Sequence, residues 1–257
     1  MNRDTSHNKT PRFSIVTVVY NAVNEILQTI QSVSQLQYHN IEYIIIDGGS
    51  SDGTLTYIKN HIEDIDTWVT EPDNGIYDAM NKGIILATGD FIIFMNAGDI
   101  FFSNDIINKV VNYADLTADI LYGDSWTIGS RHNDGLHKAK NIDNIIYGMV
   151  CSHQSMFFRT TLLKHRHFSL DYGTAGDFEL ICFMHSREYI FHRLNGITIS
   201  YYHGRGVSDT QRLQSLINCV HALRDLKLIT VRLYIYYFSA AIKEMFISLY
   251  DRITFKV

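Results

Sequence analysis

Short segments that are almost entirely apolar alternate with helical patterns through the first hundred residues of this chain. Segments that can be buried on both faces are typical of strands in a parallel sheet that helices cover on each side. The apolar residues between them recur every three or four positions, as on one face of a helix. The predicted strands span 13–20, 41–46, 68–70 and 91–95, and the predicted helices span 25–36, 54–61 and 76–87. The fold class predicted is α/β.

The alternation weakens after residue 99. The chain shows no internal repeat and no low-complexity linker, and its pattern is mostly helical from about residue 209 onward. Further elements are predicted as a helix over 104–113 and strands over 120–124, 155–158 and 197–202. We therefore expect a flexible N-terminus, one main domain and a helical C-terminal extension, at residues 1–11, 12–208 and 209–257.

Composition excludes several classes of protein. The 257 residues are 46% hydrophobic, enough for a sizeable core, so the chain is neither disordered nor collagen-like. The net charge of -5 disfavours general nucleic-acid binding, which needs a basic surplus. The three separated cysteines form no disulfide or zinc pattern. The N-terminus lacks a signal-peptide core and no apolar run is long enough to span a bilayer, so we expect a cytoplasmic protein.

Polar residues follow three of the predicted strands at the point where each strand ends. Tyr20 and Asn21 come at the end of the first strand, Asp47 comes after the second, and residues 96–99 (Asn-Ala-Gly-Asp) follow the strand at 91–95. In wound parallel sheets, ligands bind at the carboxyl ends of the strands. This pattern supports a nucleotide-type site, although many chemistries share the same arrangement.

The segment after the second strand, DGGSSDGT (47–54), suits a nucleotide. Its glycines allow a ligand to approach the backbone closely, and Asp47 can accept hydrogen bonds from a base or a ribose. The alternative is an ordinary strand-to-helix turn in which Asp52 caps the next helix.

A second loop runs into the helix predicted at 76–87. Asn74 and Gly75 would lie beside the nucleotide, and Asn81 and Lys82 would point towards a phosphate or a base. Asp78 and Lys82 are four residues apart, so the alternative is a surface ion pair between them.

Two aspartates are the candidates for chemistry. A carboxylate such as Asp99 can hold a divalent cation when a diphosphate fills the other positions, because Mg²⁺ takes one or two carboxylates plus substrate phosphates. Asp177 and Glu179 are two residues apart, so on a helix at most one of them faces the site. For Asp99 and for Asp177, the alternative is a helix cap at a turn.

Taken together, these segments resemble one enzyme family. In order, they are the strand ending VVYN, then DGGSSDGT, DNGIYDAMNKG, NAGD, SHQSMFFR and AGDFEL, within about residues 11–208. The chain is similar to glycosyltransferase family two, in particular to bacterial enzymes that build colanic-acid-type capsule, exopolysaccharide or O-antigen repeat units. The resemblance implies the GT-A fold, a wound, mostly parallel mixed sheet with a helical C-terminal tail. It also implies inverting sugar transfer from a nucleotide diphosphate donor, UDP-linked, to a hydroxyl of a glycan or lipid-linked acceptor.

The resemblance also implies roles for individual residues. Asp47 would hydrogen-bond the base, Asp99 would bind the Mn²⁺ or Mg²⁺ that bridges the diphosphate, and Asp177 would deprotonate the acceptor hydroxyl. The further residues expected to bind the donor are Tyr20, Asn21, Asn74, Gly75, Asn81, Lys82, Asn96, Ala97 and Gly98. Those expected near the acceptor or the diphosphate are His153, Gln154, Glu179, His203 and Arg205, the last two in a loop that resembles the one closing over the donor.

The chain departs from the family's usual pattern at two places. The family's metal motif carries two or three carboxylates, whereas Asn96 and Gly98 occupy neighbouring positions here, so metal binding without donor should be weak. The family's base often follows a glutamate, but Gly176 precedes Asp177 here, which leaves Glu179 as a rival for the base.

The C-terminal stretch, residues 226–252, mixes aromatic and aliphatic residues with Arg232, Lys243 and Arg252. This composition suits the headgroup region of a membrane, and a lipid-linked acceptor would make peripheral contact with the inner face of the cell membrane useful. The alternatives are a helix packed on the catalytic domain or against a second copy in a homodimer.

Two other functions fit part of the pattern. A nucleotidyltransferase usually carries a glycine-rich, basic loop directly after the first strand, whereas residues 21–25 contain no lysine or arginine. A catalytically inactive nucleotide-sugar-binding module would keep the fold without the chemistry, and the acidic residues argue against it. The expected partners are therefore a nucleotide sugar and a glycan or lipid-linked acceptor, and no nucleic acid.

Overall fold

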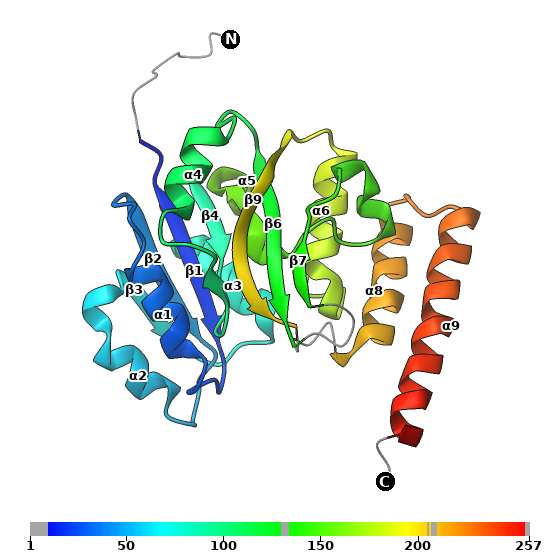
Figure 1. Cartoon of the computed structure of the whole chain (residues 1–257), viewed down its shortest axis with the longest axis horizontal. Coiled ribbons are helices and arrows are strands. Elements are labelled where there is room, and N and C mark those ends of the chain that lie inside the picture. Colours follow the sequence, from blue (N-terminus) through cyan, green and yellow to red (C-terminus); the bar gives the residue numbers. More distant parts are fainter. Residues whose placement is uncertain (1–9, 130–133, 205, 207–209, 255–257) are drawn as a thin grey trace.

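One curled sheet organises the fold (Figure 1). The structure is a computed structural model that describes residues 10–129, 134–204, 206 and 210–254, the last seven of these as backbone only. Within those residues the strand order is β3-β2-β1-β4-β8-β6-β9-β5, and β7 pairs with β6. The strands are β1 (Phe13–Val19), β2 (Ile41–Asp47), β3 (Thr67–Thr70), β4 (Phe91–Phe94), β5 (Ile100–Phe101), β6 (Ile120–Ile128), β7 (Gly135–His137), β8 (Met156–Arg159) and β9 (Phe191–His203).

The N-terminal half of the sheet is parallel. β1 lies between β2 and β4 and runs parallel to both, and β3 is parallel to β2. β8 then pairs antiparallel with β4 and with β6, while β6 and β9 are parallel. The sheet is thus mixed, with the wound parallel part where the sequence predicts it, and the α/β fold class is confirmed.

Helices cover both faces of the sheet. Their bounds are α1 (Ile26–Ser34), α2 (Thr54–Asn60), α3 (Ile76–Leu86), α4 (Ile106–Tyr113), α5 (Thr160–His165), α6 (Gly176–Ser186), α8 (Arg212–Asp225) and α9 (Val231–Thr254). Short 3₁₀ turns are η1 (Ile62–Asp64), η2 (Ile142–Tyr147), η3 (His153–Ser155) and η4 (Gly173–Ala175). Residues of α1, α2 and α4 pack in one core, and residues of α3, α5, α6 and α8 pack in the other.

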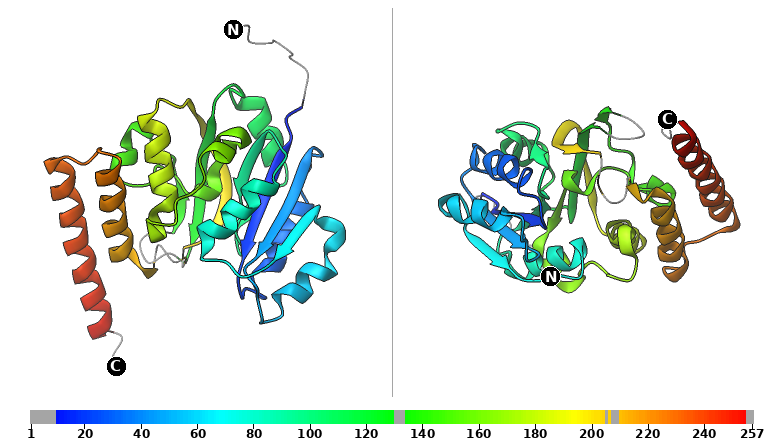
Figure 2. Two further views of the ribbon diagram at one scale, coloured as in Figure 1. Left: turned by 180° about the vertical axis from the view of Figure 1, so that it is seen from behind. Right: turned by 90° about the horizontal axis from the view of Figure 1, so that it is seen from below.

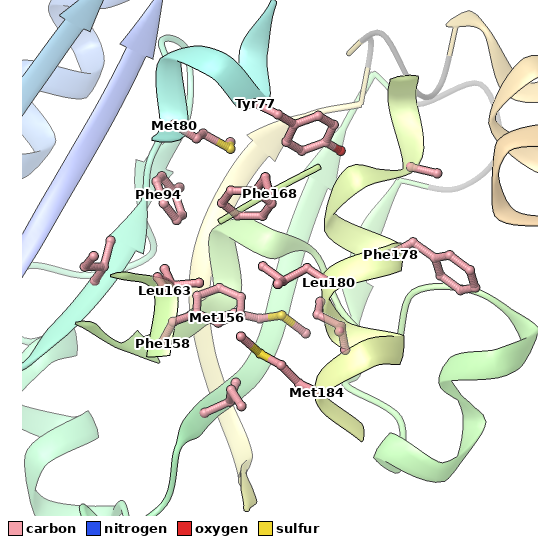
Figure 3. Packing of buried hydrophobic residues seen from close by; sticks show 14 of the residues in the cluster. Tyr77, Met80, Phe94, Met156, Phe158, Leu163, Phe168, Phe178, Leu180 and Met184 are labelled. Carbon is pink, nitrogen blue, oxygen red and sulfur yellow. The ribbon is translucent and has the colours of Figure 1, made fainter. Parts of the chain in front are cut away.

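The two covered faces of β1 explain why its sequence is almost entirely apolar. Val16 and Val18 belong to the core under α3 and α6, whereas Ile15 and Val19 belong to the core under α1. Successive side chains of a strand point to opposite faces, so a strand covered on both sides needs apolar residues at nearly every position. Figure 3 shows part of the core under α3 and α6, in which side chains from helices and strands pack together beneath the ring of Tyr77.

The later strands differ from the prediction. β6 continues to Ile128, β9 begins already at Phe191, and β7 was not predicted at all. β9 is only partly buried along its length and carries Gly196 at a φ of 74°, opposite an irregular register in β6. A half-exposed, irregular strand has neither an apolar run nor a clean alternation, so its sequence pattern is weak.

The C-terminal helices α8 and α9 lie at one end of the molecule, with α8 between α9 and the rest of the fold (Figure 2). α8 contacts α6 and η4, and α9 contacts α8 and η2. Among the helices of the described residues, none combines the length and the apolar character that a membrane span requires. Most of the predicted N-terminal segment lies outside the described residues, and the division into three parts stays a prediction.

Candidate active site

Two loops meet at the carboxyl end of β1. Asp47 is the register partner of Val19, and the Gly48 amide donates to the carbonyl of Val19 at 2.9 Å. On the other side of β1, the Ala97 amide donates to the carbonyl of Val18 at 3.1 Å. The DGGSSDGT loop after β2 and the turn after β4, residues 96–99, therefore lie on either side of one strand end.

Carboxylates hold the DGGSSDGT loop in shape. Asp47 is fully buried, and its carboxylate accepts from the Thr70 hydroxyl at 2.5 Å and from the Ser50 amide at 3.2 Å. Asp52 accepts from the amide and hydroxyl of Thr54, at 3.0 and 2.6 Å, and so fixes the turn before α2, although the N-cap position itself is Gly53. In this conformation, a base reaches the Asp47 carboxylate only if the loop rearranges.

Tyr20 and Asn21 join the end of β1 to this loop. Asn21 has a left-handed φ of 46°, and its side-chain oxygen accepts from the Ser51 amide at 2.9 Å. The ring of Tyr20 is 64% exposed and lies against Gly48, where an added Cβ would come within 3.3 Å of it. An exposed aromatic ring at the rim of the loop provides a surface on which a base can stack.

The Asn74–Gly75 turn is built by the two acidic residues that flank it. Asp73 accepts from the Gly75 amide at 2.8 Å, and Asp78 accepts from the Asn74 amide at 2.9 Å. Asp73 also lies beside the first loop, because a Cβ on Gly48 would come within 2.4 Å of its carboxylate. The turn therefore borders the same strand end as Tyr20.

Asn81 and Lys82 are held by protein partners in this structure, and their predicted contact with a phosphate or a base stays a prediction. Asn81 makes a pair of 2.9 Å hydrogen bonds with the backbone amide and carbonyl of Phe168. Lys82 donates to the carbonyl of Pro72 at 2.8 Å and pairs with Glu71 at 2.9 Å, not with the residue four positions before it. Both side chains fasten α3 to neighbouring segments, a role that local sequence patterns do not reveal.

The Asp177 carboxylate lies at the centre of a polar network. It accepts from the Tyr77 hydroxyl and the Phe178 amide, at 2.9 and 2.8 Å, and lies 3.3 Å from Nδ1 of His153. Nε2 of His153 lies 3.0 Å from the side-chain nitrogen of Asn96. Both ring nitrogens of His153 therefore have polar partners, Asp177 on one side and Asn96 on the other. The network therefore connects α6, α3 and the turn after β4.

This environment keeps Asp177 ionised. Burial alone would raise the pKa of the Asp177 carboxyl. Three partners lower it by more: His153, through a hydrogen bond and an electrostatic interaction, the Tyr77 hydroxyl and the Phe178 amide. Asp177 also lies in the first turn of α6, where the helix dipole favours a negative charge. Tyr77 was not among the site residues predicted from the sequence. The only sequence feature that could have pointed to it is its position in the DNGIYDAMNKG motif.

The glycine before Asp177 has a steric cause. A Cβ on Gly176 would lie 2.8 Å from the Tyr77 ring and 3.0 Å from the carbonyl of Ser169. The ring that holds Asp177 therefore occupies the space that a side chain at position 176 would need. Glu179 is turned away from Asp177: it is buried and pairs with Arg166 at 2.6 Å. Of the two carboxylates on α6, Asp177 is thus the one that contacts Tyr77 and His153.

Asp99 is buried in the turn after β4. Its carboxylate accepts from the Gln154 side chain at 2.9 Å and from the Asn96 amide at 3.2 Å. Burial raises the pKa of Asp99 to about 6, although these bonds and the nearby His153 oppose the shift. His153 and Gln154, predicted to contact acceptor or diphosphate, thus lie beside Asp177 and Asp99 respectively.

The turn also offers an unused oxygen. The side-chain oxygen of Asn96 is buried and has no hydrogen-bond partner among the described residues. Asn96 and Asp99 thus place an amide oxygen and a carboxylate in one short turn, and both are ligand types that suit Mg²⁺ or Mn²⁺. The described residues contain no group of three or more His, Cys, Asp or Glu side chains that could hold a metal alone. The site therefore fits a cation that also takes ligands from a substrate.

The remaining predicted residues have less defined surroundings. Gly98 has a left-handed φ of 98°, and its amide donates to the Thr29 hydroxyl at 2.9 Å, which fixes the turn that also contains Ala97. His203 is exposed at the end of β9, opposite Ile128 of β6. Arg205 lies outside the described residues.

Replacing Asp99 with asparagine should stabilise the protein at alkaline pH. Burial raises the pKa of Asp99 to about 6 in the folded protein, so keeping this carboxylate charged at pH 8 costs free energy of folding. That cost disappears as the pH falls towards the ordinary carboxyl pKa, where the group becomes protonated in both states. The variant should gain about 3 kcal/mol at pH 8, a rise of about 6–12 °C in melting temperature, and much less at pH 4. Thermal unfolding at both pH values measures this. The exposed Asp64→Asn control should change neither, and an equal gain at both pH values would contradict the assignment.

With this geometry established, comparison with known proteins identifies the family. A model of glycosyl transferase family 2 matches residues 14–190. The chain belongs to glycosyltransferase family 2. Among relatives in this family, an uncharacterised glycosyltransferase of Mycobacterium tuberculosis is 32% identical over 179 residues, covering 66% of this chain and 68% of that protein. A PGL/p-HBAD biosynthesis glycosyltransferase of the same species is 27% identical over 175 residues, covering 66% and 64%.

Solved structures of glycosyltransferases share the fold. TarS 1-349 of S. aureus, in complex with UDP, aligns at a TM-score of 0.65 and 17% identity over 82% of this chain and 65% of that chain. The mannosyltransferase PcManGT of Pyrobaculum calidifontis, in complex with GDP-Man and Mn²⁺, aligns at 0.65 and 17% over 91% and 70%. The GT-A fold is confirmed, and family membership removes the nucleotidyltransferase alternative. This chain spans about two thirds of the length of these proteins.

Proposed function

We propose that this family 2 glycosyltransferase moves a sugar from a nucleotide diphosphate donor to an acceptor hydroxyl with inversion at the anomeric carbon. The observation that carries the proposal is Asp177, an ionised carboxylate held by Tyr77 and His153 and linked through Asn96 to the turn that carries Asp99. Such a transfer requires a general base near a turn that offers oxygen ligands. Here these would be Asp177 and the turn after β4, residues 96–99.

In the proposed reaction, Asp177 takes the proton of the acceptor hydroxyl. The acceptor oxygen attacks the anomeric carbon, and the bond from that carbon to the diphosphate oxygen breaks, with its electron pair leaving on the nucleoside diphosphate. A single displacement needs one base and no covalent enzyme intermediate, which agrees with one accessible carboxylate on α6. Tyr77 and His153 orient the Asp177 carboxylate and keep it charged before the proton moves.

The donor would lie across the ends of β2, β1 and β4. The Tyr20 ring would stack on the base beside the Asp47 loop, and the Asn74–Gly75 turn would border it. Solved proteins with a similar fold support a nucleotide-sugar donor. TarS is solved with UDP and with UDP-GlcNAc, and the mannosyltransferase PcManGT is solved with GDP-Man. We infer a UDP-linked sugar as the donor.

Asp99 and the side-chain oxygen of Asn96 would hold Mn²⁺ or Mg²⁺. The bound cation would neutralise charge that develops on the leaving diphosphate. The mannosyltransferase neighbour is solved with Mn²⁺. Since Asn96 supplies a neutral ligand where the family pattern has a carboxylate, we expect cation and nucleotide to bind together rather than separately.

The acceptor would be a hydroxyl of a glycan or a lipid-linked glycan in surface polysaccharide synthesis. The relative named for PGL/p-HBAD biosynthesis supports an acceptor of the glycan or glycolipid class. The side chains that could contact it are His153, which lies beside Asp177, and Gln154, which lies beside Asp99.

A thermal-shift screen of UDP, GDP and their sugar conjugates, with and without Mn²⁺, tests the donor. At a hundredfold excess over the dissociation constant, the preferred nucleotide with Mn²⁺ should stabilise the protein by about 2.7 kcal/mol, or about 5–10 °C. Absence of any nucleotide-dependent shift would contradict the proposal. A shift without release of nucleotide from the sugar conjugate, even over long incubation, would indicate an inactive binding module instead.

A further inference from the structure

α9 presents an exposed apolar stripe to solvent. Most of its large exposed side chains are apolar or aromatic. Six of them form the stripe, and five of these six are between 59% and 77% exposed. The stripe consists of Val231, Ile235, Phe238, Ile242, Met245 and Phe246. These positions recur every three or four residues, so they lie on one side of the helix. Exposed apolar patches of this kind mark binding surfaces.

The opposite side of α9 fixes the helix to the protein. Leu233 and Tyr237 are buried, and the Tyr237 hydroxyl donates to the carbonyl of Ile146 in η2 at 3.1 Å. The Tyr236 hydroxyl donates to the carbonyl of Tyr147 at 3.0 Å. The stripe therefore faces away from the sheet at the outer edge of the molecule, as Figure 2 shows for the helix as a whole.

The charges on α9 decide between possible partners. Among its described side chains, Arg232 and Lys243 are exposed, whereas its acidic residue, Glu244, is buried. Over residues 231–247, the described exposed surface of α9 is thus apolar and positive, although the whole chain has a net charge of -5. Basic residues beside an apolar, aromatic-rich helix face suit an anionic lipid surface, in which apolar side chains enter the acyl boundary.

A second copy of the chain suits this surface less well. Val231, Ile235, Phe238, Ile242 and Met245 have the four-three spacing of a paired helix. Paired helices favour opposite charges beside such positions, whereas the exposed charged residues among the described side chains of α9, Arg232 and Lys243, are both basic. We propose that the stripe of α9 docks on a membrane surface that carries anionic lipids.

Co-sedimentation with lipid vesicles tests the proposal without using transfer activity. The full chain should bind vesicles of phosphatidylcholine mixed with phosphatidylglycerol, and bind pure phosphatidylcholine weakly. The double variant Phe238→Ser and Phe246→Ser should weaken binding about a hundredfold or more, because both exposed rings would no longer enter the lipid. Arg232→Gln with Lys243→Gln should weaken binding to the anionic vesicles about tenfold.

Tyr113→Ser is the matched control, since Tyr113 is 71% exposed on α4. It should bind vesicles like the unaltered chain, and unchanged melting temperatures of all variants would show that the fold is intact. Failure of the unaltered chain to sediment with anionic vesicles would overturn the proposal. So would vesicle binding that survives the Phe238 and Phe246 changes. A dimer in solution that these changes dissociate, without vesicle binding, would assign the stripe to a second copy.

Discussion

Asp177→Asn should reduce the rate of sugar transfer by about a thousandfold or more while donor binding stays within about threefold of the unaltered enzyme. Proton removal by a positioned base contributes about 10²- to 10⁴-fold, and an amide of the same shape cannot accept the proton. The amide keeps a carbonyl oxygen for the Tyr77 hydroxyl, so the fold and the donor site remain. Steady-state rates with a nucleotide sugar, alongside calorimetric titration of the nucleotide with Mn²⁺, measure both effects.

Glu179→Gln is the control for this experiment. Glu179 is buried against Arg166, away from the Asp177 network, so transfer should stay within about tenfold even if the variant loses stability. Retained turnover in Asp177→Asn, with a large loss in Glu179→Gln, would transfer the role of base to Glu179.

Asp99→Asn should lower the affinity for nucleotide in the presence of Mn²⁺ by about a hundredfold. Removing the single carboxylate of an oxygen donor pair takes away the anionic ligand on which cation binding depends. The same substitution is expected to raise the melting temperature at pH 8, so lost binding could not be attributed to unfolding. Calorimetry of UDP with and without Mn²⁺ measures the change.

Asn96→Asp provides the complementary test. A second carboxylate at the buried, unpartnered oxygen should allow Mn²⁺ to bind without nucleotide, about tenfold more tightly than to the unaltered chain. If Asp99→Asn left the effect of Mn²⁺ on nucleotide affinity unchanged, or if Asn96→Asp left Mn²⁺ affinity unchanged, the cation would have to bind somewhere other than this turn.

The parallel part of the fold could be predicted because its strands are covered on both faces. β1 has all seven residues buried, and this leaves an apolar run that only a central strand requires. β7 and the first half of β9 gave no such signal, because their side chains are mixed in exposure and β9 has a glycine at positive φ. Sequence periodicity reports burial, so it fails where a strand is half exposed.

For the site, the sequence could place residues on strand ends but could not orient side chains on helices. Asp47, Asp99 and Asp177 lie where strand ends and a helix start were expected. Asn81 and Lys82 were expected to face a ligand, but their partners are fixed by contacts that local patterns do not contain, such as Asn81 with Phe168, 87 residues away. The contact of Tyr77 with Asp177, 100 residues away, was missed for the same reason.

The same long-range contact explains one departure from the family pattern. Gly176 precedes Asp177 because the Tyr77 ring fills the space beside it. The resemblance alone marked this glycine as an anomaly. The structure links it to Tyr77, whose hydroxyl donates to the Asp177 carboxylate.

A crystal of the protein with UDP and Mn²⁺, measured for anomalous scattering of manganese, tests the central claim most directly. We expect one strong anomalous peak bonded to the Asp99 carboxylate and the side-chain oxygen of Asn96, with the diphosphate beside it and the uracil against the Tyr20 ring. Manganese and nucleotide bound elsewhere on the protein, with the ends of β1, β2 and β4 free of ligand, would contradict the account.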